Sequence, residues 1–505
     1  MVEMTSRRAA IRGFGWGVFG GIVLVALMYV ASALLGLRPL TQALNEPLLS
    51  IMPGFVFGFL IDTLQHAGKV VEEVGLIVAM VAALGVLGAA WSVTALRWHF
   101  AQSALVFAGI GWLVVVVILL PVAGVGFLGL NDGFNTPLIW AVLFAVYGVM
   151  LQLGGRPAAA AAPAAADPDR RRLLSALPLG LGAVSLGLLG LLRVPNWYQA
   201  VANAPEAGLT GISPVITPVQ NFYIVSKNLG GDPVVDGQSW RLAIGGLVDH
   251  PQTLSLSQLR ALPSTTQYVT LECISNDIGG ALISTGSFTG VKMSDLIAMA
   301  SPRSTGTWAA FHSTDGYDES LPMSLINSQA SILVAYDLDG APLPTSHGYP
   351  ARVLIPGHYG MKGPKWLTSI DLVDHESGGY WEQQGWDHNA VVKTTSRFDT
   401  PRDSDIVKLG TVTLAGVAYA GNRGISKVEY STNRGSTWSA ATLTAPLSDL
   451  TWVLWQATWT PGSEGSYTLM VRATDSAGAL QGSGNAPSYP GGATGFHTIR
   501  VDVAK

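Results

Sequence analysis

The residue of this chain with the most distinctive chemistry is its single cysteine, Cys273. It follows the valine- and threonine-containing run 269–272, which reads as a strand, and precedes the turn-forming segment 275–280, which ends in two glycines. Because it is the only thiol in 505 residues, it cannot form an intrachain disulfide. A thiolate presented where a strand ends is a suitable metal ligand. The alternative is that Cys273 packs in a core as a small hydrophobic side chain.

The composition divides the chain into an apolar part and a polar part. Hydrophobic residues make up 49% and charged residues 12%, with a mean hydropathy of +0.36, which is too apolar for an ordinary soluble protein. The apolar excess lies before Pro195. The length predicts about three domains. A net charge of -4 and the absence of a long basic block argue against nucleic acid as a partner.

The apolar part contains several segments long enough to cross a bilayer, which takes about 20 helical residues. A further segment, 48–61, is apolar but short and contains Pro53 and Gly54, so it reads as a sixth span, a re-entrant piece or an interfacial piece. The five predicted spans are 14–37, 74–96, 100–122, 137–153 and 173–192.

Basic residues set the orientation of these spans, because those in short loops favour the cytoplasmic side. With five spans, Arg7, Arg97, Arg156 and the cluster 170–172 all lie inside. A crossing by 48–61 would place Arg97 and the cluster outside. We therefore expect five spans in the cell membrane, in contact with lipid, with the soluble part on the extracytoplasmic side.

The segment before the fifth span suggests how the soluble part is exported. Residues 157–169 are rich in alanine and proline and are expected to form a flexible connector. The triple arginine 170–172 and the apolar run after it resemble a twin-arginine export signal, but a plain positive-inside anchor explains them equally well. His66 and His99 lie at predicted helix ends, as interfacial histidines or, alternatively, as a haem pair.

The polar part shows two patterns of secondary structure. Short strands alternate with short helices up to about residue 400, which predicts an α+β domain, and strands alone follow, which predicts a β-sandwich. The first pattern predicts strands at 240–244, 268–272, 308–313, 332–336 and 351–355 and helices at 257–261 and 293–300. The second predicts strands at 411–417, 426–431, 452–459 and 466–473.

A series of motifs in the polar part points to one family. In chain order they are TPVQNFY at 217–223, WRL at 240–242, LECISN at 271–276, FTGV at 288–291, HGYPARVLIPG at 347–357, YGMKGPKWL at 359–367, GVAYAG at 416–421, VEYS at 428–431 and RATD at 472–475. Their order and spacing resemble the sulfite oxidase family of molybdopterin-dependent oxidoreductases, of a membrane-anchored bacterial type. We therefore expect a helical membrane domain at 1–195, an α+β molybdopterin domain at 196–400 and an immunoglobulin-like dimerisation domain at 401–505.

The resemblance implies a molybdenum cofactor and assigns residues to it. Cys273 is expected to ligate molybdenum and to be the catalytic residue. Arg352 is suited to clamp the pterin phosphate, Lys362 to act as a point charge, and nearby glycines to let backbone N–H groups approach. The implied cofactor-binding residues are Asn221, Tyr223, Cys273, Ser313, His347, Arg352, Gly360, Met361 and Lys362.

The chain departs from the family where the substrate binds. Sulfite oxidases hold their dianionic substrate with arginines, one of them shortly after the ligand cysteine, but 275–278 contains none and Asp277 would repel an anion. The segment 224–227 also lacks the expected arginine and offers only Lys227. We therefore expect that sulfite is not the substrate and that the enzyme transfers an oxo group, with a neutral S-oxide or N-oxide to be reduced as one option.

The implied partners follow from what the sequence lacks. No Cys-x-x-Cys-His haem attachment motif occurs, and one cysteine cannot complete a cysteine-ligated iron–sulfur cluster, so electrons are expected to come from an external carrier or a membrane redox partner. The C-terminal domain implies a homodimer. A competing reading is a membrane-tethered scaffold on the same fold without cofactor, in which Cys273 is dispensable.

Overall fold

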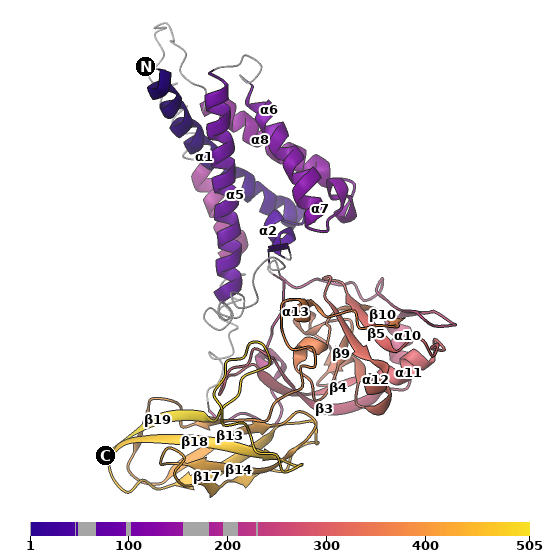
Figure 1. Cartoon of the computed structure of the whole chain (residues 1–505), viewed down its shortest axis with the longest axis vertical. Helices are drawn as coiled ribbons and strands as arrows, with labels where there is room; N and C mark the ends of the chain where they lie inside the picture. Colours follow the sequence, from indigo (N-terminus) through magenta and orange to yellow (C-terminus); the bar gives the residue numbers. More distant parts are fainter. Residues whose placement is uncertain are drawn as a thin grey trace. The chain divides into compact units, whose positions relative to one another are not determined.

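The computed structural model describes residues 2–45, 47–48, 67–96, 103–154, 181–194, 211–228 and 231–505. It contains two compact units: the described residues up to 194 belong to the first and those from 211 to 505 to the second. The described part of the first unit is helical, and the second is built mainly of strands (Figure 1). Each unit is described by itself below.

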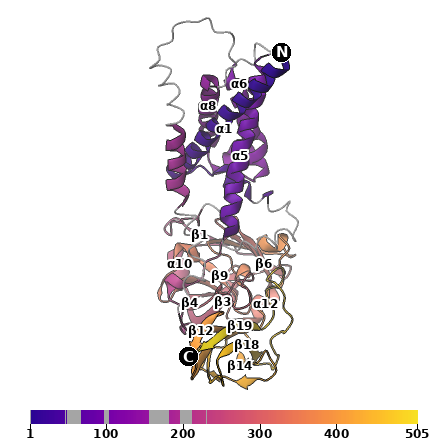
Figure 2. The same ribbon diagram turned by 90° about the vertical axis from the view of Figure 1, so that its left-hand side faces the viewer.

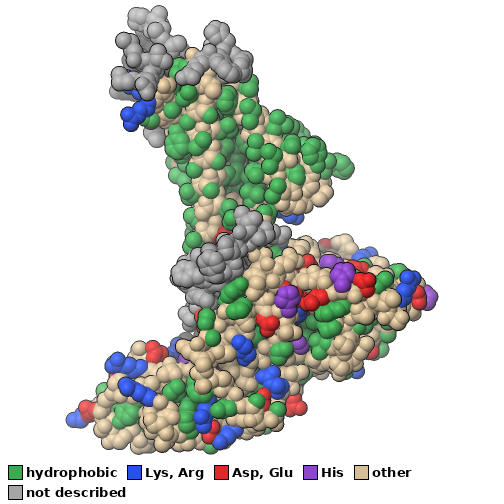
Figure 3. Space-filling model, viewed as in Figure 1, with side chains coloured by type: hydrophobic (Ala, Val, Ile, Leu, Met, Phe, Trp, Pro, Cys, Tyr) green, Lys and Arg blue, Asp and Glu red, His purple; other side chains and the backbone are tan. Residues whose placement is uncertain are grey.

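Four helical stretches of the first unit are long and apolar enough to span a membrane: 6–35, 70–94, 104–122 and 136–154. They belong to α1 (Val2–Leu35), α5 (Ala67–Thr94), α6 (Ala104–Leu113) with its continuation through η2 (Val114–Leu119) and α7 (Leu120–Val122), and α8 (Thr136–Gly154). Figure 2 shows α1, α5, α6 and α8 running alongside one another. Hydrophobic side chains cover much of their visible surface (Figure 3). These stretches match the first four predicted spans in position, and their length and composition fit a membrane anchor.

Glycines let α1 and α5 pack closely. A Cβ added at Gly17 would lie 2.6 Å from the Leu84 carbonyl oxygen, and one at Gly88 would lie 2.4 Å from the Gly13 carbonyl oxygen. Small residues at such contacts are typical of helices that pack in membranes, where close backbone approach adds van der Waals contact. Shorter helical elements of this unit include α2 (Leu40–Ala43) and η3 (Phe127–Asp132).

The fifth predicted span is described only in part. Its C-terminal portion forms an apolar helix at Leu181–Val194, which is shorter than a full span, so a count of five stays a prediction. The predictions for 49–61, for the connector 157–169, for the triple arginine and for His66 and His99 concern residues outside the described ranges.

A buried ionic contact ties the helix at 181–194 to the others. Arg193 and Glu73 are 4% and 1% exposed, and Arg193 Nη2 lies 2.6 Å from Glu73 Oε2. Tyr29 Oη of α1 donates to Glu73 Oε1 at 2.8 Å. Because an isolated charge inside an apolar bundle is costly, this pairing holds three helices in one arrangement.

The α+β part of the second unit is built on two sheets. The first has the order β2-β1-β10-β5-β6, in which β1 pairs with β10 in parallel and the other pairs are antiparallel. Its strands are β1 (Arg241–Gly246), β2 (Gln252–Ser255), β5 (Trp308–Ser313), β6 (Asp318–Pro322) and β10 (Leu367–Val373). The helices are α10 (Leu256–Ala261), α11 (Met293–Ala298) and α12 (Met323–Ser328).

The second sheet carries the residues around Cys273. Its order is β3-β4-β7-β8, with β9 paired to β7. Its strands are β3 (Thr265–Glu272), β4 (Ile283–Lys292), β7 (Leu333–Leu338), β8 (Ala341–Pro342) and β9 (Arg352–Leu354). The five strands and two helices predicted for this domain all appear, with shifted ends except at Trp308–Ser313.

The C-terminal part is a two-sheet sandwich. One sheet has the order β11-β13-β17-β16 and the other β12-β19-β18-β14-β15, and they share one hydrophobic core. The strands are β11 (Thr395–Thr400), β12 (Asp405–Lys408), β13 (Val412–Tyr419), β14 (Ile425–Ser431), β15 (Ser439–Ala440), β16 (Thr442–Leu443), β17 (Val453–Trp459), β18 (Gly465–Asp475) and β19 (His497–Ala504). The four predicted strands are present, and the relation to immunoglobulin domains stays a prediction.

Candidate active site

Loops at the ends of both sheets of the α+β part enclose one cavity. Cys273 directly follows β3, Arg352 begins β9, and Trp381 lies in α13 (Tyr380–Gln383). Two short 3-10 helices, η6 (Thr345–His347) and η7 (Gly360–Lys362), add further side chains. The lining residues are Phe222, Tyr223, Val225, Ser226, Lys227, Leu271, Cys273, Ile274, Ser275, Asp315, Tyr317, His347, Arg352, Gly360, Met361, Lys365, Trp366, Trp381 and Trp386.

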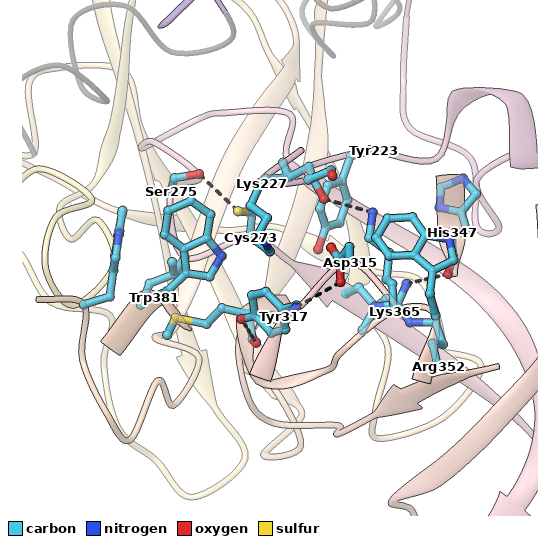
Figure 4. Close-up of a pocket in the computed structure, with 18 of the residues that line it drawn as sticks. Tyr223, Lys227, Cys273, Ser275, Asp315, Tyr317, His347, Arg352, Lys365 and Trp381 are labelled. Atoms are coloured by element: carbon cyan, nitrogen blue, oxygen red, sulfur yellow. Dashed lines mark hydrogen bonds between the residues drawn. The ribbon is translucent and has the colours of Figure 1, made fainter. Parts of the chain in front are cut away.

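The cavity has two chemically different ends. Cys273, Ser275 and Trp381 lie at one end, and His347, Arg352 and Lys365 lie at the other (Figure 4). We call them the thiol end and the cationic end. A ligand that fills the cavity must therefore offer an anionic group on one side and a metal or another thiol-seeking group on the other.

Arg352 is the strongest indication that the cationic end binds an anion. It is only 6% exposed, and its guanidinium makes two long hydrogen bonds of 3.4 Å, to the carbonyl oxygens of His347 and Gly363. Its Nε has no hydrogen-bond partner, and no carboxylate pairs with it among the described residues. Burial lowers its pKa because the charged form is desolvated. A buried guanidinium in this state favours an anion that the described part of the chain does not supply.

Lysines reinforce the positive charge of the cavity. Lys365 Nζ donates to the carbonyl oxygens of Ser346 at 2.8 Å and Val225 at 3.0 Å, which fixes the ammonium group at the cationic end. Lys227 also lines the cavity, whereas Asp315 is the only carboxylate among the lining residues. At the cationic end, Arg352 and Lys365 offer two positive charges, which match a dianionic phosphate group.

Cys273 faces the cavity rather than a hydrophobic core. Its Sγ lines the cavity and lies 3.0 Å from Ser275 Oγ. Burial raises the pKa of the thiol, so the free protein holds it protonated at neutral pH. A metal ion that binds there displaces the proton, because the thiolate is the ligand form.

The loop after Cys273 is held from both sides. Asn276 Oδ1 accepts from the Leu282 N–H at 2.9 Å, and Asn276 Nδ2 donates to Glu272 Oε1 at 2.9 Å. From the sandwich, Arg397 donates to the Gly280 carbonyl oxygen and pairs with Asp399 at 2.9 Å. These contacts fix the backbone on which the sulfur sits.

His347 is a neutral group beside two cations. It is 4% exposed, and burial together with Arg352 and Lys365 lowers its pKa to about 3. Its ring packs edge-on against Phe222, with centroids 5.3 Å apart. A neutral imidazole can exchange hydrogen bonds with a pterin ring or a phosphate without adding to the positive charge.

The lowered pKa of His347 predicts a pH dependence in the cofactor-free protein. Because the folded state resists protonation, stability falls as the pH drops below the unfolded pKa of about 6.5. A His347→Gln variant removes this contribution. When the pH falls from 7.5 to 5, its free energy of unfolding should therefore decrease by about 2 kcal/mol less than that of wild type. Thermal unfolding at the two pH values checks this, with exposed His250→Gln as the control. Equal losses in His347→Gln and wild type would contradict it.

The structure brings together most of the predicted site residues. Tyr223, Cys273, His347, Arg352, Gly360 and Met361 all line the cavity. Gly360 is needed for a close approach, because a Cβ there would lie 2.8 Å from the Tyr223 hydroxyl oxygen. Three predicted residues are not among the lining residues. Asn221 is exposed, and Ser313 is buried with a hydroxyl that has no partner among the described residues.

Lys362 is the third predicted residue that does not line the cavity, and its contacts indicate a structural role. Its Nζ lies 2.6 Å from Glu319 Oε1 and 2.5 Å from Glu382 Oε1, and all three side chains are buried. Two carboxylates already compensate its charge, so it is a poor partner for a phosphate. Lys365, three residues later, is the lysine that lines the cavity.

Two family models match the second unit. An oxidoreductase molybdopterin binding domain matches residues 229–381, and a Mo-co oxidoreductase dimerisation domain matches residues 387–502. The chain belongs to the sulfite oxidase family of molybdopterin-dependent oxidoreductases. As a member of this family it is an oxidoreductase, and its cofactor is molybdopterin-bound molybdenum.

Individual relatives agree with the family. The chain is 28% identical over 340 residues to sulfite oxidase of Arabidopsis thaliana, which covers 55% of this chain and 85% of the plant enzyme. It is 28% identical over 321 residues to mitochondrial sulfite oxidase of Homo sapiens, covering 54% of this chain and 58% of the human enzyme. It is also 26% identical over 277 residues to NADH nitrate reductase of Ulva prolifera, covering 44% of this chain and 32% of that enzyme.

A solved structure shows the same fold. The sulfane dehydrogenase SoxCD of Paracoccus pantotrophus aligns with a TM-score of 0.51 and 21% identity, covering 60% of this chain and 86% of the SoxCD chain. At this identity the likeness concerns the fold alone.

The cavity of this family member fits the molybdenum cofactor. The unpaired guanidinium of Arg352 and the ammonium of Lys365 match a phosphate, and the Cys273 thiol at the opposite end matches the metal. Sequence reasoning missed the aromatic wall of Trp381 and Trp386, because neither stands in a motif that carries the resemblance.

Proposed function

We propose that this member of the sulfite oxidase family is a membrane-anchored oxo-transfer enzyme that reduces a neutral S-oxide or N-oxide. Four long apolar helices in the first unit support a multi-pass anchor. The positive-inside distribution of arginines supports an extracytoplasmic catalytic domain. The dimerisation domain supports a homodimer.

The residues of the cavity divide the work of holding the cofactor. Arg352 and Lys365 hold the phosphate, and His347 and Tyr223 contact the pterin together with the backbone of 360–361. Cys273 ligates molybdenum. When bound, the cofactor supplies the two-electron couple and the oxygen-accepting atom.

One observation carries the choice of substrate: no arginine lies at the thiol end of the cavity. Arg352 is the only arginine among the lining residues, and it lies at the cationic end (Figure 4). Ser275 and Trp381 lie near Cys273 in Figure 4, and Ile274 follows Cys273 in the chain and also lines the cavity. A dianion such as sulfite needs charge-assisted hydrogen bonds to enter a buried site, whereas a neutral oxide does not.

Besides the substrate and the cofactor-loaded enzyme, the overall reaction needs only an electron donor. A sulfoxide takes up two electrons and two protons and yields the corresponding thioether and water, so the S–O bond breaks and sulfur is reduced. An external reduced carrier supplies the electrons, and water supplies the protons. The apolar side chains of Ile274 and Trp381 exclude solvent from the reacting oxygen.

The test is a comparison of two assays on molybdenum-loaded protein. We expect methyl phenyl sulfoxide or trimethylamine N-oxide to be reduced with a reduced viologen dye as electron donor. Oxidation of sulfite with ferricyanide should have a kcat/KM at least about 100-fold lower than that of these neutral oxides, because each lost charge-assisted contact is worth about 1.5–3 kcal/mol. Efficient sulfite oxidation would overturn the proposal.

Lys227 provides the matched control for that comparison. It is 8% exposed and lies over the Tyr380 ring at 4.8 Å, so it is the cation that could replace the missing arginine. Lys227→Met should leave turnover of the neutral oxides within about threefold of wild type, because their binding needs no full charge. The cofactor-free scaffold is not supported, because the family assignment makes the chain an enzyme.

A further inference from the structure

We propose that Glu319, Lys362 and Glu382 form a buried ionic cluster that holds two walls of the cavity together, and that the cluster is most stable while Glu319 carries a proton. Glu319 lies in β6, Lys362 in η7 and Glu382 in α13. This role is independent of which substrate the enzyme takes.

The three groups of the ionic cluster contact one another away from solvent. Lys362 Nζ lies 2.6 Å from Glu319 Oε1 and 2.5 Å from Glu382 Oε1, and the three side chains are at most 4% exposed. Gly379, which precedes α13, allows a close approach. Its N–H donates to Glu382 Oε2 at 2.7 Å, and an added Cβ would lie 2.4 Å from Glu319 Oε2. The cluster therefore joins three elements that are distant in the sequence.

Two of these elements line the cavity. The 3-10 helix η7 contributes Gly360 and Met361, and α13 contributes Trp381. Tyr317, which precedes β6, also lines the cavity, and its hydroxyl donates to the Met361 carbonyl oxygen at 2.5 Å. The three cluster residues are not among the lining residues. They are positioning residues, because they act through the neighbours that they hold in place.

The charges of the ionic cluster balance only when one carboxyl group is neutral. One ammonium group faces two carboxylates, and a second carboxylate would be a buried charge without compensation. Glu382 has partners for both oxygens, whereas Glu319 Oε2 is buried and has no hydrogen-bond partner among the described residues. Burial raises the pKa of Glu319 to about 8, with Lys362 opposing this effect and Glu382 adding to it. At neutral pH the proton therefore resides on Glu319.

Other titratable groups surround the ionic cluster. His388, whose side chain is 62% exposed, lies 3.3 Å from Glu382 Oε2. Burial and the charge of Lys362 lower the pKa of His358, which therefore stays neutral. The acidic groups around the cluster are Asp315, Tyr317, Asp318 and Glu376. Among all these groups only His388 can add a positive charge near neutral pH, and it faces Glu382 rather than Glu319.

The proton on Glu319 makes the ionic cluster dependent on pH. In the intact cluster Glu319 keeps its proton up to about pH 8, whereas a carboxyl group in water loses it near the ordinary pKa of 4.5. Opening of the cluster therefore releases a proton between these values, so a rise in pH favours the open form. For one proton with these two pKa values, the opening constant increases about 50-fold from pH 6 to pH 8 and only about twofold from pH 8 to pH 9.

Hydrogen exchange of the segment 379–386 measures this opening. The amides of Gln383, Gly385 and Trp386 report on it, because they bond within the segment. Full-length, molybdenum-loaded wild type in detergent is compared with Glu319→Gln, and exchange rates are corrected for their intrinsic pH dependence. Wild type should show the increase of about 50-fold from pH 6 to pH 8. Glu319→Gln keeps the shape of the protonated carboxyl group but has no proton to release, so its rate should stay nearly constant.

Strand β18 of the sandwich is the internal reference. Its amides should exchange more slowly than the segment 379–386 at each pH, because the opening is local. Equal corrected rates in both segments would mean global unfolding and would contradict the proposal. A wild-type rate that does not change between pH 6 and pH 8, or the same increase in Glu319→Gln, would overturn the assignment of the proton.

Two further variants test the source of the proton and the contact itself. His388→Gln should keep the increase, and its loss in this variant would assign the proton to the histidine instead. Gly379→Ala changes no titratable group, but its methyl group displaces the Glu319 carboxyl group. It should raise the opening constant at every pH by about five- to 100-fold, the usual range for overpacking. Unchanged exchange in this variant would contradict the role of the contact.

Loss of molybdenum during dialysis tests whether the ionic cluster positions the cavity. Because η7 contributes to the cavity wall, Gly379→Ala should release molybdenum faster than wild type at pH 6. Wild type should release it faster at pH 8 than at pH 6, and by a larger factor than Glu319→Gln. Equal factors in the two proteins would show that the cluster does not hold the cavity and would overturn its positioning role.

Discussion

The Cys273→Ser variant is expected to lose turnover by on the order of 100-fold or more while it stays folded, because even residues outside the metal ligands are worth 10–100-fold at such sites. Serine is close in size to cysteine, so the loop held by Asn276 and Arg397 keeps its contacts. Its hydroxyl is a much poorer ligand than a thiolate and changes the electron density at the metal. Steady-state reduction of methyl phenyl sulfoxide, normalised to molybdenum content, measures the loss.

Ser275→Ala is the matched control for that variant. It removes the hydroxyl that lies 3.0 Å from Cys273 Sγ but leaves the ligand in place. Its effect should stay within about tenfold, the size of one lost hydrogen bond to sulfur. Turnover of Cys273→Ser near the wild-type rate would contradict the assignment of Cys273 as the catalytic ligand.

Arg352→Met is expected to have opposite effects on the two forms of the protein. In the cofactor-free form it removes a buried guanidinium that no carboxylate of the described residues pairs with, so the variant should unfold at a higher temperature than wild type. In the loaded form it removes the charge that holds the phosphate. Retention of the cofactor should fall by about 10- to 100-fold, from 1.5–3 kcal/mol per charge-assisted bond.

These opposite effects on the cofactor-free and the loaded form distinguish a binding role of Arg352 from a structural role. Molybdenum content after dialysis and thermal unfolding of both forms are measured for wild type, Arg352→Met and Arg352→Lys. The lysine variant keeps a charge and should retain more cofactor than the methionine variant. If Arg352→Met destabilises the cofactor-free protein as well, the arginine supports the fold rather than an anion.

The polar part of the fold was predictable in part: nine of its 19 described strands were predicted as short runs bounded by turns, and ten were not. Trp308–Ser313 was predicted to the residue, and the predicted sandwich strands appear with small shifts. β4 (Ile283–Lys292) is the longest but one of the strands in the structure and was among those not predicted. Its sequence alternates serine, threonine and glycine with few apolar residues, yet its first four residues are all buried between neighbouring strands. Burial of such polar residues depends on partners distant in the sequence.

The site was predictable where a motif fixed it and not where tertiary contacts did. Cys273, His347 and Arg352 stand in motifs, and all three line the cavity. Lys362 and Lys365 stand in one basic, glycine-rich segment, and the sequence gives no reason to prefer either. Lys362 turns away because Glu319 and Glu382 meet it, from β6 and α13.

The measurement that tests the central claim most directly is molybdenum X-ray absorption on purified wild type and Cys273→Ser. The account predicts near-stoichiometric molybdenum with pterin in the wild type, and one sulfur ligand fewer in the variant. The same number of sulfur ligands in both proteins, or a wild type without molybdenum from a host that makes and exports the cofactor, would contradict it.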